Sequence, residues 1–315
     1  KIARANISHK NENFDAKFGV TRVDTDGFSA MTPKGEKAKN YEDDGYENTT
    51  VNLKLGYNFD DSNRVSTSYE IIDTKVDMDG YDSSYNPVPN NKDIAKTKTH
   101  LANITYENRN DIALTKVYGN YTDIKREYTS GTPKYKGTIK EYGLNTSIDY
   151  LSSSNVTMGA DYKDFEDKEM SKDYDNKGIF ISNTNKFFDD KTIFTQALRY
   201  DKYSDFDNKA TGKVGIKQYI IDELNVSSNY GTGYNVPTIS QLFGQWGANP
   251  DLNPEKTKGY DIGIEYKGFS ITYFNTKVNN LIDAPANVYE NVEGDSKFKG
   301  IELAYKNYVT EDIFL

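Results

Sequence analysis

The 315-residue sequence contains no cysteine and only two histidines, His9 and His100. These shortages exclude disulfide frameworks, thiolate nucleophiles and Cys/His zinc sites, and they remove most histidine-centred acid–base chemistry. The sequence also lacks any run of roughly 18 or more apolar residues, so it predicts no membrane-spanning helix. Its net charge of -9 is opposite in sign to the basic surface of a nucleic-acid-binding protein. We therefore expect neither an enzyme nor a partner made of nucleic acid.

Aromatic residues are abundant although the chain is polar overall. Hydrophobic residues make up 36% of the sequence, whereas 26 tyrosines and 15 phenylalanines raise the aromatic content to 13%. Disordered proteins are poor in aromatic residues, so this composition excludes disorder. The remaining signal is alternation of apolar and polar residues with a period of two, which indicates strands with two different faces. It is clearest in residues 51–59, 142–150, 156–163, 260–267 and 301–306.

Short and long polar connections alternate along the chain. The short turns lie at 10–13, 60–63, 108–111, 152–155, 189–191, 222–223 and near Gly268, and the longer stretches at 26–48, 78–98, 129–138, 167–177, 201–210, 235–256 and 284–297. This order places all long loops on one side of roughly sixteen strands of about 9 to 12 residues, a length that crosses a tilted bilayer. One-sided loops are typical of a bacterial outer-membrane barrel. The predicted fold class is therefore all-β, an antiparallel transmembrane β-barrel.

A soluble antiparallel protein is the alternative interpretation, because alternation alone shows only that one face of a sheet is apolar. A sandwich would bury that face in a core of Leu, Val and Ile. Here aromatic residues gather near the strand ends instead, for example Tyr57, Tyr106, Tyr150 and Tyr266. This distribution fits the aromatic girdles of a membrane barrel. The polar inward faces predict a lumen that is hydrated or filled by a polar object.

Two adjoining segments carry a family resemblance. Residues 231–244 read GTGYNVPTISQLFG, and residues 249–266 read NPDLNPEKTKGYDIGIEY. Together they resemble the barrel signature of TonB-dependent outer-membrane receptors, as do the strand ends NNLI at 279–282 and KGIE at 299–302. Pro237 would stop the strand ladder, and the two Asn-Pro pairs are turn formers. The resemblance spans essentially the whole chain.

Membership in this family would imply a barrel of about 22 strands around an N-terminal plug, of which this chain would supply about 16. We therefore expect residues 1–315 to form one barrel domain, a fragment truncated at both ends, with the plug outside it. The resemblance implies an active transport receptor in the bacterial outer membrane. Its partners would be the lipid bilayer, the TonB energy-transducing complex acting through the plug, and a scarce small-molecule nutrient.

The order of the loops is most similar to that of cobalamin-transporting members of the family. Cobalamin offers apolar faces and an amide rim, which suit a pocket of aromatic and amide side chains. The expected substrate contacts are Tyr234, Gln241, Phe243, Trp246 and Asn249.

A ferric siderophore is the alternative cargo, whereas haem is disfavoured because neither histidine falls in a long loop. A passive porin is the alternative from another class, since porins are complete at about 16 strands, but porins lack the segment from Val-Pro-Thr to Asn-Pro-Glu.

Two acidic segments resemble the calcium-binding loops of the cobalamin transporters. They are YEDDGY at 41–46 and DGY at 79–81, the second accompanied by Asp93. Calcium takes about 6 to 8 oxygen ligands, which carboxylates supply. The resemblance implies calcium as a cofactor, with ligands Glu42, Asp44, Asp79 and Asp93. The alternative is that these are ordinary solvated acidic loops.

Overall fold

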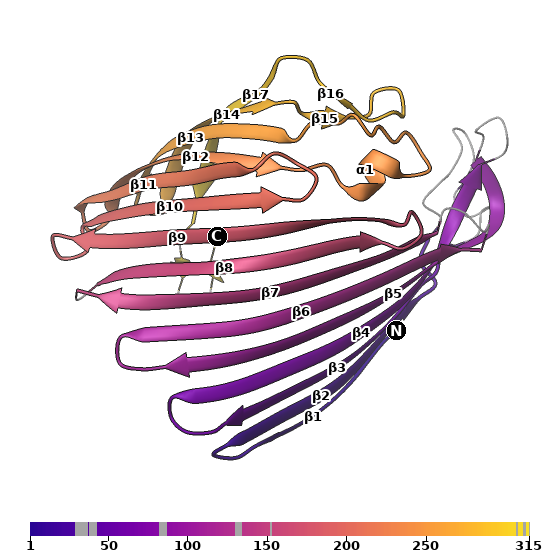
Figure 1. The fold of residues 1–315 in the computed structure, drawn as a ribbon, viewed down its shortest axis with the longest axis horizontal. Helices are drawn as coiled ribbons and strands as arrows, with labels where there is room; N and C mark the ends of the chain where they lie inside the picture. The colour runs from indigo at the N-terminus through magenta and orange to yellow at the C-terminus, as the bar shows by residue number, and fades with distance from the viewer. Residues whose placement is uncertain are drawn as a thin grey trace. The chain divides into compact units, whose positions relative to one another are not determined.

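A computed structural model describes residues 1–28, 37, 43–81, 87–129, 134–151, 153–306, 308–310 and 313–314. The chain divides into two compact units, which are described separately. Residues 1–109, 116–143 and 163–174 form the first unit, and the second comprises residues 110–115, 144–162 and 175–315. The principal sheet contains fifteen antiparallel strands, which follow one another in chain order (Figure 1).

The first unit contains β1 (Ile2–Lys10), β2 (Phe14–Thr25), β3 (Tyr46–Asn58), β4 (Asn63–Tyr81) and β5 (Pro87–Arg109). Four strands have residues in both units: β6 (Ala113–Tyr128), β7 (Tyr135–Tyr150), β8 (Ser154–Asp167) and β9 (Lys172–Phe187). The second unit contains β10 (Thr192–Tyr203), β11 (Lys209–Ile221), β12 (Leu224–Asn235), α1 (Ile239–Phe243), β13 (Glu255–Tyr266), β14 (Phe269–Asn279), β15 (Ile282–Asp283), β16 (Glu290–Asn291), β17 (Asp295–Tyr305), β18 (Tyr308–Thr310) and β19 (Ile313–Phe314).

The pairing of the strands confirms the predicted hairpins and their alternation. Val51 lies opposite Ile71, and Leu53 lies opposite Tyr69, so the apolar residues of β3 and β4 share one face. Leu53 and Tyr69 are 39% and 42% exposed. Among the described residues, the large aliphatic side chains that are buried are only Leu242, Leu252 and Val278. Apolar side chains therefore cover an outer face rather than fill a core, which is the arrangement of a membrane barrel and not of a sandwich.

Several strands extend further than the sequence pattern predicted. The prediction of a long loop over residues 78–98 is wrong for most of its length, because β4 runs for 19 residues and β5 for 23. A strand ladder needs only backbone hydrogen bonds, which polar residues make as well as apolar ones. The change to polar residues thus marks where the strands leave the apolar layer, not where they end.

The short turns lie at one end of the hairpins (Figure 1), and those at Asn11, Asp60 and Asn110 share one hydrogen-bonding pattern. The Asn11 Oδ1 accepts from the backbone N–H groups of Asn13 and Phe14, at 3.0 and 2.7 Å. Asp60 and Asn110 accept from backbone N–H groups two and three residues ahead in the same way. Such side-chain-closed turns explain why Asn and Asp recur at these positions. Within the described residues, no helix has the length and apolar character needed to cross a membrane.

Candidate ligand-binding loops and polar lumen

The connection between β12 and β13, residues 236–254, folds into a compact loop. Pro237 is fully buried, and Leu242 and Leu252 are 7% and 6% exposed. Its helix α1 begins with a capping box: the Thr238 Oγ1 accepts from the Gln241 N–H at 3.2 Å, and the Gln241 Oε1 accepts from the Thr238 N–H at 2.9 Å. These two residues satisfy backbone donors that a helix of five residues would otherwise leave unpaired. The segment PTISQLF is thus explained as the start and the buried side of this helix.

Hydrogen bonds join this loop to the connection between β14 and β17, residues 280–294. The Asn249 side chain donates to the Tyr289 carbonyl at 2.9 Å, and the Tyr289 N–H donates to the Gly247 carbonyl at 2.7 Å. Gly247 has φ +62°, and an added Cβ there would collide with the Asn287 carbonyl. The position therefore requires glycine both for its backbone conformation and for the close approach of the second loop.

The glutamate of the Asn-Pro-Glu motif closes the base of both loops. The Glu255 Oε2 accepts from the Asn235 side chain at 2.8 Å, and its Oε1 accepts from the Ile282 N–H at 2.8 Å. The Asn280 side chain donates to the Pro254 carbonyl at 3.4 Å. The sequence signature is thus a set of contacts that hold two loops together, and we call these joined loops, residues 236–254 and 280–294, the loop platform.

Four of the five predicted substrate contacts lie on the loop platform. Trp246 and Phe243 are 68% and 41% exposed. The amide groups of Gln241 and Asn249 are engaged within the platform, in the helix cap and with Tyr289. Tyr234 lies on β12, where its hydroxyl donates to the Asp207 carbonyl at 3.1 Å and its ring centroid is 5.9 Å from that of Tyr203. Phe243 and Trp246, which we call the aromatic pair, thus lie exposed on the platform, and their contact with a substrate stays a prediction.

Three of the four predicted calcium ligands, Asp44, Asp79 and Asp93, are described by the structure, and all three belong to the first unit. Asp44 precedes β3, and Asp79 and Asp93 lie on β4 and β5 rather than in a loop as predicted. Asp93 is opposite Met78, beside the bulge that includes Asp79, and its Oδ1 accepts from the Thr129 hydroxyl at 2.6 Å. Glu42 lies outside the described residues.

The donor chemistry of these loops fits calcium, but the described side chains are not assembled into a site. Asp24, Asp26, Asp43 and Asp77 line a cavity of about 230 Å³, which Glu47 and Lys75 also line. In the described part of the chain, no group of three or more His, Asp or Glu side chains is arranged to hold a metal ion. No geometry of a bound ion follows from these positions.

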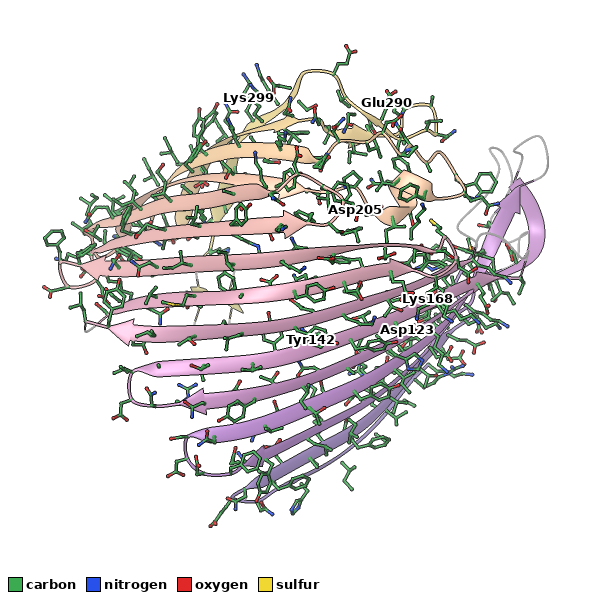
Figure 2. All side chains as sticks on the ribbon, in the orientation of Figure 1. Asp123, Tyr142, Lys168, Asp205, Glu290 and Lys299 are labelled. Carbon is green, nitrogen blue, oxygen red and sulfur yellow. The ribbon has the colours of Figure 1, made fainter. Side chains whose placement is uncertain are left out.

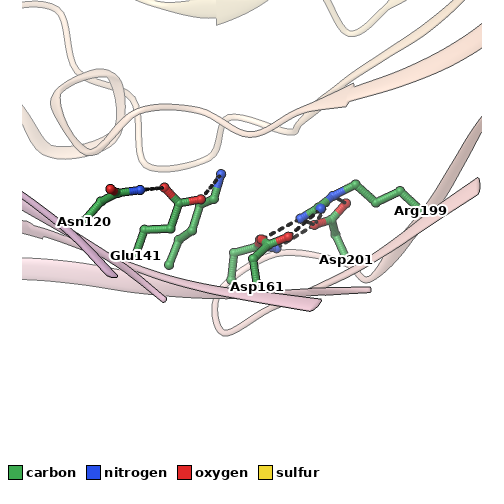
Figure 3. A network of polar contacts seen from close by, with 7 residues as sticks. Asn120, Glu141, Asp161, Arg199 and Asp201 are labelled. Carbon is green, nitrogen blue, oxygen red and sulfur yellow. Dashed lines mark hydrogen bonds and ion pairs between the residues drawn. The ribbon is translucent and has the colours of Figure 1, made fainter. Parts of the chain in front are cut away.

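In the second unit, an arginine cluster lies on the face opposite to the apolar one. Arg199 donates to both carboxylate oxygens of Asp161 at 2.7 and 2.9 Å, and it also donates to Asp201 (Figure 3). The Asn176 side chain donates to Asp201 at 3.1 Å. Gly178 leaves the space, because an added Cβ would collide with the guanidinium group. The members of this cluster come from three strands, so no local sequence pattern reveals it.

A series of hydrogen-bonded polar side chains lies on the inward face of the first unit. The Asn103 side chain donates to Asn120 at 2.7 Å. Asn120 in turn donates to Glu141 at 3.0 Å (Figure 3). Glu141 also forms an ion pair with Lys163 at 3.3 Å. These contacts fix the inward side chains in place, so each unit presents an ordered polar surface of mixed charge.

The antiparallel strand pattern agrees with comparisons to known proteins. Residues 4–313 match the family model described as TonB dependent receptor-like, beta-barrel. This chain belongs to that family. TonB-dependent receptors of this type are bacterial outer-membrane proteins and not enzymes, so the predicted fold class, location and absence of an enzymatic function are confirmed.

Among curated relatives in the TonB-dependent receptor family, the vitamin B12 transporter BtuB of Photobacterium profundum is 24% identical over 310 residues, covering 91% of this chain and 49% of that protein. BtuB of Vibrio vulnificus is 26% identical over 304 residues, covering 89% of this chain and 47% of that protein. The chain thus spans about half the length of the curated relatives that it matches along most of its sequence.

Solved structures in the same family share the fold at lower identity. The siderophore receptor PirA from Pseudomonas aeruginosa gives a TM-score of 0.77 at 15% identity, covering 99% of this chain and 61% of that one. The hemophore receptor HasR of Serratia marcescens, in complex with its hemophore HasA and heme, gives a TM-score of 0.72 at 15% identity, covering 97% of this chain and 58% of that one. At these identities the likeness shows the fold alone.

Proposed function

We propose that the protein containing this chain imports cobalamin across the outer membrane, with energy from the TonB complex acting through a plug domain. In this proposal residues 1–315 are the barrel domain, a fragment of the whole receptor. The observation that carries the cargo assignment is the similarity to vitamin B12 transporters over about nine-tenths of the chain. The structure supports it with one feature of the second unit, the exposed aromatic pair on the loop platform.

The aromatic pair suits an apolar ring face. Phe243 closes α1 and Trp246 follows it in a turn, on a backbone that buried Leu242 and the contacts of Asn249 hold in place. A binding surface that is already ordered loses less conformational entropy when a ligand arrives. The amide rim of the corrin would meet the polar groups of the platform, while its face covers the two aromatic rings.

A ferric siderophore remains the second candidate, favoured by the structural likeness to siderophore receptors. That likeness concerns the fold and not the loops. Haem has less support from the described side chains, because His100 bonds to the Tyr69 hydroxyl at 2.7 Å and lies opposite Ile71 on the outward face. A ligand to haem iron would have to come from the long loops instead.

We also propose that calcium orders the acidic loops of the first unit. The carboxylates of Asp24, Asp26, Asp43 and Asp77 repel one another around one cavity, and a divalent cation would offset that repulsion. Glu42, Asp44, Asp79 and Asp93, the ligands that the family resemblance implies, would contribute further oxygen atoms. Calorimetric titration of the intact receptor with Ca²⁺ tests this: Asp44→Asn and Asp79→Asn should each weaken uptake, and unchanged uptake in both would contradict the proposal.

The cargo is tested by equilibrium binding to the full-length receptor in detergent, titrated with cyanocobalamin and, separately, with a ferric catecholate siderophore. Trp246→Ala and Phe243→Ala should each weaken cobalamin binding by about tenfold, the loss of one aromatic contact of roughly 1.4 kcal/mol. Phe188→Ala is the matched control, since Phe188 is 79% exposed in a short turn at the other end of the strands. Siderophore binding without cobalamin binding would reverse the order of the two candidates.

A further inference from the structure

Three lysines lie side by side on the outward face of β13, β14 and β17. Lys258 is directly opposite Lys277, and Lys277 is directly opposite Lys297. Like charges in directly opposed positions of a sheet destabilise it unless counter-ions are near. Lys299, labelled in Figure 2, follows Lys297 by two residues on β17. It shares the face of Lys297, since alternate residues of a strand share a face. We call Lys258, Lys277, Lys297 and Lys299 the lysine row.

The lysine row continues an ordered sequence of side chains along these strands. Ile264, Ile271 and Leu303 face one another across the three strands, and the next row consists of Ile262, Tyr273 and Ile301. Then follow Tyr260, Asn275 and Lys299, and after them Lys258, Lys277 and Lys297. Successive rows are about 7 Å apart, because a strand rises about 3.4 Å per residue. The face thus passes from apolar to aromatic to basic within a few rows.

This gradient places the lysine row at the outer boundary of the bilayer. The apolar rows are exposed, with Ile262 at 49% and Leu303 at 76%, as expected of side chains that meet acyl chains in an outer-membrane barrel. The lysines lie toward the end of the strands that carries the loop platform, the side of the long outer loops. They are therefore at the level of lipid headgroups, on the opposite face from the lumen.

Local acidic residues do not neutralise this row. Lys277 forms an ion pair with Asp295 at 2.6 Å. Among the residues that the structure describes, the other three lysines of the row form no ion pair. In the first unit, the outward charges of β2 to β4 are paired differently: Glu47 pairs with Arg22 and, at 3.3 Å, with Lys75. Outward lysine there is balanced within the protein, whereas the lysine row carries an excess of positive charge.

We propose that the lysine row binds the phosphate groups of an anionic lipid headgroup in the outer leaflet. A lysine ammonium is a flexible point charge that suits phosphate, and its aliphatic stem can lie along the apolar rows beneath. The acyl chains of the same lipid would cover Ile262, Tyr273 and Ile301. The site is thus a lipid-binding surface on the outside of the receptor, distinct from the ligand platform and independent of which nutrient is carried.

The test uses the full-length receptor in nanodiscs that contain a trace of bis-phosphorylated lipid A or its dephosphorylated form, with retained lipid counted by native mass spectrometry. Replacing Lys258, Lys297 and Lys299 by glutamine should reduce retention of the phosphorylated lipid at least about tenfold, since each lysine near an anionic surface contributes. The dephosphorylated lipid should be held weakly by both proteins. Arginine at the same three positions should preserve retention.

Matched variants separate this site from a general effect of charge. Lys75→Gln, Lys96→Gln and Lys140→Gln together remove the same charge from other outward positions, and they should leave retention unchanged. Asp295→Asn should raise retention about twofold by releasing Lys277 from its ion pair. Equal losses in the two triple variants, or no loss in the first, would overturn the proposal. Displacement of the phosphorylated lipid by millimolar inorganic phosphate would also overturn the proposal, because the lysines would then bind any phosphate anion rather than a lipid.

Discussion

Asn253 and Asn291 hold each other by a reciprocal pair of hydrogen bonds. The Asn253 N–H donates to the Asn291 Oδ1 at 2.7 Å, and the Asn291 Nδ2 donates to the Asn253 carbonyl at 2.9 Å. The same Nδ2 donates to the Asn280 carbonyl at 2.8 Å. The Asn291 side chain thus bonds to backbone groups of both loops of the platform and helps to hold them together.

Asn291→Ala should loosen the platform without unfolding the barrel. The variant loses three hydrogen bonds at about 1 kcal/mol each, all of them in loops rather than in the strand ladder. Hydrogen–deuterium exchange should show faster exchange at residues 249–253, with strand amides unchanged. Val288→Ala, at a side chain that is 51% exposed in the same loop, is the control. Equal exchange in both variants would mean that the loops are held mainly by other contacts.

Arg199→Ala should destabilise the second unit strongly. Asp161 and Asp201 are 9% and 8% exposed, and removal of the arginine leaves two nearby carboxylates without their shared counter-charge. Breaking a largely buried pair in this way costs about 3 kcal/mol. Urea unfolding of the receptor in lipid vesicles measures this cost.

Gly178→Ala should weaken the same cluster, because the added methyl group occupies the space of the guanidinium. Lys125→Ala removes an ion pair with Glu127 whose side chains are 50% and 41% exposed, and it should change stability far less. A cost for Arg199→Ala as small as that for Lys125→Ala would show that water compensates for the lost arginine.

Much of the fold could be predicted from periodicity, because a strand between lipid and lumen must alternate. The pairs Val51–Ile71 and Ile262–Tyr273 fall on the predicted apolar face. The ends of β4 and β5 could not be predicted in this way, because residues beyond the bilayer are polar on both faces while the ladder continues.

The site was less predictable because residue type does not reveal how a side chain is used. Gln241 and Asn249 were expected to contact substrate for their amides, and the structure shows those amides bonded within the platform; their contact with substrate stays a prediction. Contacts that depend on the register between strands could not be predicted from the sequence. Arg199 meets Asp161 only because β8, β9 and β10 are neighbours, and Lys258 meets Lys277 only through one particular pairing.

The assignment of the two faces makes a direct prediction about charge. Ile262→Arg places a cation against acyl chains and should cost about 2 to 4 kcal/mol if the residue lies near the bilayer midplane. Asn145→Arg, on the opposite face of β7 from the exposed Leu144, should cost much less because that face is polar. Urea unfolding midpoints of the two variants in lipid vesicles, each compared with the unmodified receptor, measure the two costs. Equal costs would mean that the faces are assigned wrongly.

The turn at Asp60 should depend on pH in a way that its counterparts do not. Hydrogen bonds from the Asn63 side chain and then from the Ser62 N–H lower the pKa of Asp60. Because the folded pKa lies below the unfolded value of about 3.9, the stabilisation is fully present above that value and is lost as the pH falls through the folded pKa. Hydrogen exchange of the Ser62 and Asn63 amides should therefore become faster in acid, relative to the rate expected for an unprotected amide at the same pH.

Asp60→Asn should abolish this dependence and keep the turn, because Asn11 and Asn110 close equivalent turns with a neutral amide. Loss of protection in acid by the asparagine variant as well would assign the effect to another group.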